Sequence, residues 1–134
     1  MNTSTESNDV LSQIRAQHPT VILTRGAKFS TGSIVATPAA LKLLQKHGFI
    51  AAQLLARHIA GDWGDCYKED AELNIAALQD GSRLFSVYRL VSDDVMKDLP
   101  QSKRSNLPTI WIITESKNEF GVRQVTTLLC PEDY

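Results

Sequence analysis

The chain has 134 residues, of which 43% are hydrophobic and 22% are charged, and its formal net charge is −1. This length and apolar content predict one globular domain, and the near-neutral charge excludes the broad basic surface of a dedicated nucleic-acid-binding protein. The two cysteines, Cys66 and Cys130, lack CxxC or metal-ligand spacing, which favours a reducing compartment over a disulfide scaffold or a zinc site.

The N-terminal residues 1–8 are polar, so we expect a disordered tail followed by a single domain over residues 9–134. Because these opening residues are polar, we expect no signal peptide, and no apolar run approaches the ~18 residues that cross a bilayer. We therefore expect a cytoplasmic protein without a membrane partner. Residues 9–17 are weakly amphipathic and predict about two turns of helix.

Two short β-branched runs, residues 21–24 and 33–36, predict strands joined by a hairpin or an irregular crossover. The dipeptide Thr37–Pro38 then predicts the start of a helix, because a threonine side chain caps free amides and proline fits the first turn. Gly48 is the expected end of that helix.

A second helix is expected from Ala51 to Gly61, with His58 on its apolar face. A third is expected from Asp65 or Cys66 to Gln79, with Asp65 as its cap. Within this third helix, the polar side chains of Asp70 and Asn74 lie on the apolar side and need partners.

Three further strands are predicted at residues 83–90, 110–114 and 124–129, and the last two are expected to form an antiparallel hairpin. Residues 91–108 are long, polar and interrupted by proline, so we expect a mobile excursion there. The element order β-β-α-α-α-β-β-β predicts an α+β fold, an antiparallel sheet with about three helices packed on one face. Because the strand around Trp111 is apolar on both faces, its second face needs a cover, which makes a homodimer contact possible.

The most unusual segment is residues 61–65, Gly-Asp-Trp-Gly-Asp, where an indole lies between two aspartates and two glycines. We interpret Asp62, Trp63, Asp65, Asp70 and Asn74 as a binding or structural turn. Trp63 either covers the helix pair or stacks on a ligand, and the first alternative is favoured. The carboxylates of Asp62, Asp65, Glu69 and Asp70 could bind a hard cation, but helix capping is the favoured role, so we expect no metal and no cofactor.

Several motifs resemble small uncharacterised proteins carried by bacterial plasmids and integrative elements. They are GSIVATP at 32–38, ARH at 56–58, GDWGD at 61–65, ED at 69–70, IWIITE at 110–115 and TTLLCPEDY at 126–134. The likeness covers roughly residues 32–134, and it implies a mobile-element context without a mechanism. Residues 91–108 and 116–123 look longer here than the turns of such sequences.

Two functions follow as hypotheses. The favoured one is a non-catalytic accessory protein that binds a protein partner or itself, with the turn at 61–65 bracing the helices. The alternative is a metal-independent ribonuclease of the barnase-like toxin class, in which His58 is the general acid or base. In that enzyme Arg57 or Arg89 would stabilise the phosphate, and the orienting hydroxyls would be those of Ser86, Thr114 and Thr126. Loop cations such as Lys28, Arg104 and Arg123 are expected to be solvated surface charges.

Overall fold

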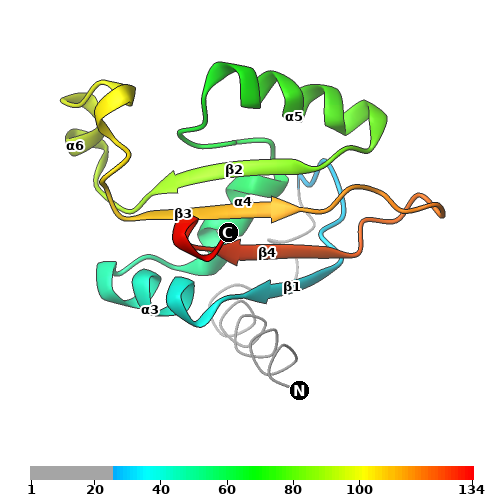
Figure 1. The fold of residues 1–134 in the computed structure, drawn as a ribbon, viewed down its shortest axis with the longest axis horizontal. Helices are drawn as coiled ribbons and strands as arrows, with labels where there is room; N and C mark the ends of the chain where they lie inside the picture. The colour runs from blue at the N-terminus through cyan, green and yellow to red at the C-terminus, as the bar shows by residue number, and fades with distance from the viewer. Residues whose placement is uncertain (1–25) are drawn as a thin grey trace.

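The computed structural model describes residues 26–134, so the predicted tail, the helix at 9–17 and the strand at 21–24 lie outside the described residues. Figure 1 shows the described elements in chain order. They are β1 (Ser33–Ala36), α3 (Pro38–His47), α4 (Ala51–Ile59), α5 (Lys68–Asp80), β2 (Leu84–Arg89), α6 (Asp93–Lys97), the 3₁₀ helix η1 (Gln101–Lys103), β3 (Thr109–Thr114), β4 (Val125–Leu129) and the 3₁₀ helix η2 (Pro131–Asp133).

The four strands of the described region form one sheet in the order β1-β4-β3-β2. The α+β class and the antiparallel β3–β4 hairpin are confirmed, with Thr114 opposite Thr126. The prediction of a wholly antiparallel sheet is wrong, because β1 runs parallel to β4. The chain between these two strands contains four α-helices and two further strands, so no tight turn dictates their relative direction.

Local sequence signals account for the two helices that cover one face of the sheet. The Thr37 hydroxyl accepts a hydrogen bond from the Ala40 N–H at 3.1 Å, and Gly48 ends α3 with a φ of 70°. Helix α4 follows at once and buries most of one side. Its side chains pack with those of α3 against the inward-facing residues of the strands, which include Ile34, Ile112 and Leu128.

The prediction places all three helices on one face of the sheet. Helix α5 instead lies along the edge strand β2 (Figure 1). The Asn74 amide donates to the Phe85 carbonyl at 2.7 Å and accepts from the Phe85 N–H at 2.9 Å. Two residues further on, the Val87 N–H donates to the Trp63 carbonyl at 3.0 Å, and the Asp65 N–H donates to the Val87 carbonyl at 2.6 Å. The outward-facing backbone groups of Phe85 and Val87 are thereby satisfied.

Residues 91–108 contain α6 and η1, so the described region has a fourth α-helix where only an excursion was predicted. The Arg104 side chain fixes this segment, since it donates to the Leu99 and Met96 carbonyls, both at 2.8 Å. The mobility expected for residues 91–108 stays a prediction.

On the outer face of the sheet, three aromatic side chains of the chain pack together and cover the face in part, since Phe85 and Trp111 are half-buried and Tyr134 is exposed. The Trp111 ring packs edge-on against Phe85 at 5.1 Å and against Tyr134 at 5.7 Å between centroids. Arg83 donates to the Tyr134 hydroxyl at 2.9 Å. Within residues 26–134, no helix combines the length and apolar character needed to cross a bilayer.

Candidate functional site

His58 lies at the centre of a buried chain of hydroxyl groups. Its Nδ1 is 2.6 Å from the Ser86 Oγ and its Nε2 is 2.9 Å from the Thr114 Oγ1. The Thr114 hydroxyl lies 2.7 Å from that of Thr126, which donates to the Thr31 carbonyl at 2.9 Å. Four predicted site residues are thus brought together, because the strand register places these hydroxyls on the inner face below α4.

The environment of His58 favours the uncharged imidazole. The side chain has no exposed surface. Burial, with a smaller contribution from the positive charge of Arg123, lowers the pKa of His58 from 6.5 to about 3. A neutral ring has one donor and one acceptor nitrogen, and a hydroxyl can partner either one. The hydroxyl chain therefore satisfies a buried neutral histidine at physiological pH.

Two aromatic rings close over this histidine. The Trp63 side chain is buried, and its ring lies 5.9 Å from the His58 ring and 6.3 Å from the Phe29 ring. The Phe29 ring meets His58 edge-on at 5.2 Å. The Tyr88 hydroxyl donates to the Asp62 carbonyl at 2.6 Å and holds the turn in place. A substrate cannot reach the imidazole in this arrangement.

The turn itself is fixed by Asp62 and Gly64. The Asp62 carboxylate accepts from the Arg57 Nε at 2.7 Å and from the Gly64 N–H at 3.1 Å. Partial burial opposes ionisation, but these hydrogen bonds and the nearby positive charge outweigh it, so the pKa of Asp62 lies below its ordinary value. Gly64 has a φ of 72°, and a Cβ at this position would lie 2.0 Å from the Val87 carbonyl oxygen. Only glycine fits there.

Asp65 is not the helix cap that its position predicted, since α5 begins at Lys68 after Tyr67. Instead, its buried carboxylate accepts from the Arg89 Nε at 2.9 Å and from the Arg104 Nη1 at 2.6 Å. Two guanidinium partners stabilise the charge of a carboxylate that is removed from water more than the amides of a helix end do alone. Sequence reasoning missed Arg104, because nothing in the local pattern links a loop arginine to an aspartate 39 positions earlier.

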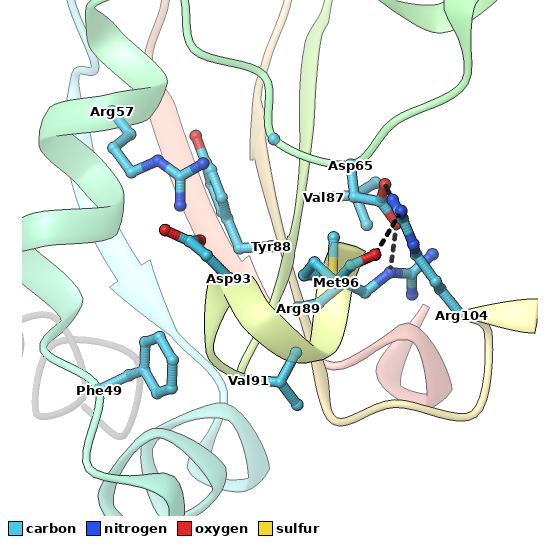
Figure 2. A pocket seen from close by; sticks show the side chains of 11 residues that line it. Phe49, Arg57, Asp65, Val87, Tyr88, Arg89, Val91, Asp93, Met96 and Arg104 are labelled. Carbon is cyan, nitrogen blue, oxygen red and sulfur yellow. Dashed lines mark hydrogen bonds and ion pairs between the residues drawn. The ribbon is translucent and has the colours of Figure 1, made fainter. Parts of the chain in front are cut away.

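An open cleft of about 340 Å³ lies beside this turn, between α4, β2 and α6 (Figure 2). We call it the arginine cleft. Its wall carries three arginines, of which two are held by Asp65 and one by Asp62. The Arg57 guanidinium lies over the Tyr88 ring, 4.7 Å from its centroid, and faces Asp93 across the cleft. The half-buried apolar side chains of the lining are Phe49, Val91 and Met96.

The remaining predicted residues lie elsewhere. Asn74 closes the edge of β2, while Glu69 and Asp70 lie in the first turn of α5. Asp62 and Asp65 are already engaged by arginines. Over residues 26–134, no group of three or more His, Cys, Asp or Glu side chains is arranged to hold a metal ion.

Comparisons with protein-family models, with curated proteins and with solved structures each gave no match for this chain.

Proposed function

We propose that this chain is a non-catalytic interaction protein, in the mobile-element setting that its sequence motifs imply, and that the arginine cleft binds a segment of a protein partner. The observation that carries the proposal is the composition of the cleft. Arginine, methionine and aromatic side chains are enriched where proteins bind one another, and Arg57, Met96 and Phe49 line the same opening.

The ion pairs of the cleft add a second argument. Arg89 and Arg104 are held by the buried Asp65 carboxylate, and Arg57 is held by Asp62. Side chains that are fixed before binding lose less conformational entropy when a partner docks. The unused donors of these guanidinium groups can then contact backbone carbonyls or carboxylates of the bound segment.

The ribonuclease alternative remains a prediction, and the same geometry weighs against it. A general acid must meet the leaving oxygen, yet His58 is sealed beneath Trp63 and Phe29. With a pKa of about 3, the imidazole is neutral near pH 7, so it has no imidazolium proton to donate as a general acid, and it is a weak general base. Incubation with RNA in a chelator should give no cleavage, for the wild-type protein and for His58→Gln alike.

The test of the proposed function compares two substitutions on one short helix. Met96 lines the cleft, whereas its neighbour Val95 is 41% exposed and is not part of the lining. Wild-type protein, Met96→Asp and Val95→Asp would each be used to capture partners from the native cell, with thermal melts confirming their folding. We expect a protein that is retained by the wild type and by Val95→Asp and lost from Met96→Asp.

Equal retention by both variants would refute the proposal. Sedimentation of the purified protein supplies the second arm. A dimer that Met96→Asp dissociates and Val95→Asp does not would assign the cleft to self-association instead.

A further inference from the structure

A second cavity, of about 360 Å³, opens at the other end of the molecule from α6. It lies between residues 28–30, the last turn of α5 and the loop that joins β3 to β4, all at the end of the sheet where β3 stops (Figure 1). We call it the basic cavity. Its lining includes Lys28, Lys117 and Arg123, and no carboxylate.

Arg123 is the unusual member of this set, because it is only 4% exposed. Its Nη1 donates to the Ser82 carbonyl at 2.6 Å and to the Glu115 carbonyl at 3.0 Å, and its Nη2 donates to the Ala77 carbonyl at 3.0 Å. All three acceptors are neutral. The Nε is buried and has no hydrogen-bond partner among the described residues.

The charge of Arg123 is thus bound by peptide dipoles, and no carboxylate among the described residues forms an ion pair with it. The ion pairs of residues 26–134 involve only Asp62 and Asp65, which belong to the arginine cleft. Asp80 acts on Arg123 from a distance, but its carboxylate accepts from the Ser82 N–H and lies outside the lining. A buried cation without a counter-ion is costly, and an anion in the cavity would offset that cost.

The two lysines complete the arrangement. The Lys28 side chain rests against Gly61, and that of Lys117 rests against Gly81, where an added Cβ would approach each lysine Cδ to 3.0 Å. Their backbones are fixed too, since the Lys28 N–H donates to the Ile59 carbonyl and the Lys117 N–H to the Gly81 carbonyl, both at 2.8 Å. The apolar stems are packed, and neither ammonium group forms a hydrogen bond or an ion pair with another residue of 26–134.

We propose that the basic cavity binds a phosphate monoester, with the phosphate beside Arg123 and the two lysine ammonium groups. Because the cavity carries three positive charges, it should bind a phosphate dianion more tightly than it binds a singly charged carboxylate. The cavity has the size of a small-molecule site, and the apolar part of its wall is formed by Phe29, Leu78 and Val122, which fit a compact apolar or aromatic body.

The test uses phenyl phosphate, inorganic phosphate and benzoate as probes in calorimetric titrations at constant ionic strength. Arg123 also holds three carbonyls, so its removal could unfold the protein, and the variant is therefore the double substitution Lys28→Gln with Lys117→Gln. The matched control is Lys42→Gln with Lys46→Gln, two exposed lysines of α3. We expect saturable binding of phenyl phosphate, weakened about tenfold or more in the variant and unchanged in the control.

Nitrogen-edited NMR locates the ligand independently, because the Arg123 Nε–H resonance should move during the phenyl phosphate titration. Any one of four results would overturn the proposal. They are no saturable binding of phenyl phosphate, equal binding by the lysine variant, an Arg123 Nε–H signal that stays fixed while phosphate binds, and benzoate binding as tight as that of phenyl phosphate.

Discussion

As the pH falls below 7, protonation of His58 in the unfolded chain should lower the free energy of unfolding. The imidazole has a pKa near 6.5 in the unfolded chain and about 3 in the folded one. Above pH 6.5 it is neutral in both states, so stability is independent of it. As the pH falls from 6.5 toward 3, the unfolded chain takes up a proton that the folded chain cannot accept, and the free energy of unfolding decreases.

The size of this effect follows from the difference in pKa. Each pH unit in the window changes the free energy of unfolding by about 1.4 kcal/mol, so lowering the pH from 7 to 5 should cost about 2 kcal/mol. Asp62, whose pKa lies below its ordinary value of 3.8, loses its own contribution only at lower pH and does not interfere.

Urea unfolding at pH 7 and at pH 5 measures this difference directly. His58→Gln should abolish most of it, since glutamine does not titrate, whereas His47→Gln removes an exposed histidine at the end of α3 and should leave it unchanged. NMR of the folded wild type should show a His58 ring that does not titrate between pH 7 and 5. Equal stability of the wild type at both pH values, or a midpoint near 6 for the folded His58, would refute the reasoning.

Three substitutions in the turn test its structural role, each measured by urea unfolding. Trp63→Ala should cost about 3–5 kcal/mol, because the residue is only 8% exposed and its ring packs against aromatic neighbours. Gly64→Ala should cost more than about 3 kcal/mol, whereas Gly121→Ala, with a similar φ of 73° and open space around it, should cost only about 1 kcal/mol. Asp65→Asn should cost about 3 kcal/mol, because two part-buried arginines lose their counter-ion. Near-neutral values would show that the turn does not support the fold.

Local chemistry accounts for most of the elements that sequence reasoning found. Thr37, Pro38 and Gly48 define α3 through capping and backbone preferences that depend only on near neighbours. The β-branched run at Ser33–Ala36 marks β1 with the predicted bounds. The α+β class follows from the order of such elements.

Long-range pairing was beyond the same reasoning. The parallel alignment of β1 with β4 depends on contacts about 90 residues apart, and no local pattern encodes a strand's partner. The role of Asp65 was misassigned for the same reason, since an aspartate before a helix has the composition of a cap whether or not arginines from β2 and the following loop reach it. Arg123 was expected at the surface, and only the fold shows that the end of α5 buries it.

The closed side of β2 has a consequence for the behaviour of the protein in concentrated solution. A foreign polypeptide that tried to extend the sheet there would find the amide groups of Phe85 and Val87 already taken by Asn74, Trp63 and Asp65. Fibril growth at this edge would first require α5 and the turn at residues 61–65 to dissociate from β2. Amide hydrogen exchange at Phe85 and Val87 should accordingly be as slow as in the interior strands, although β2 has a strand neighbour on one side only.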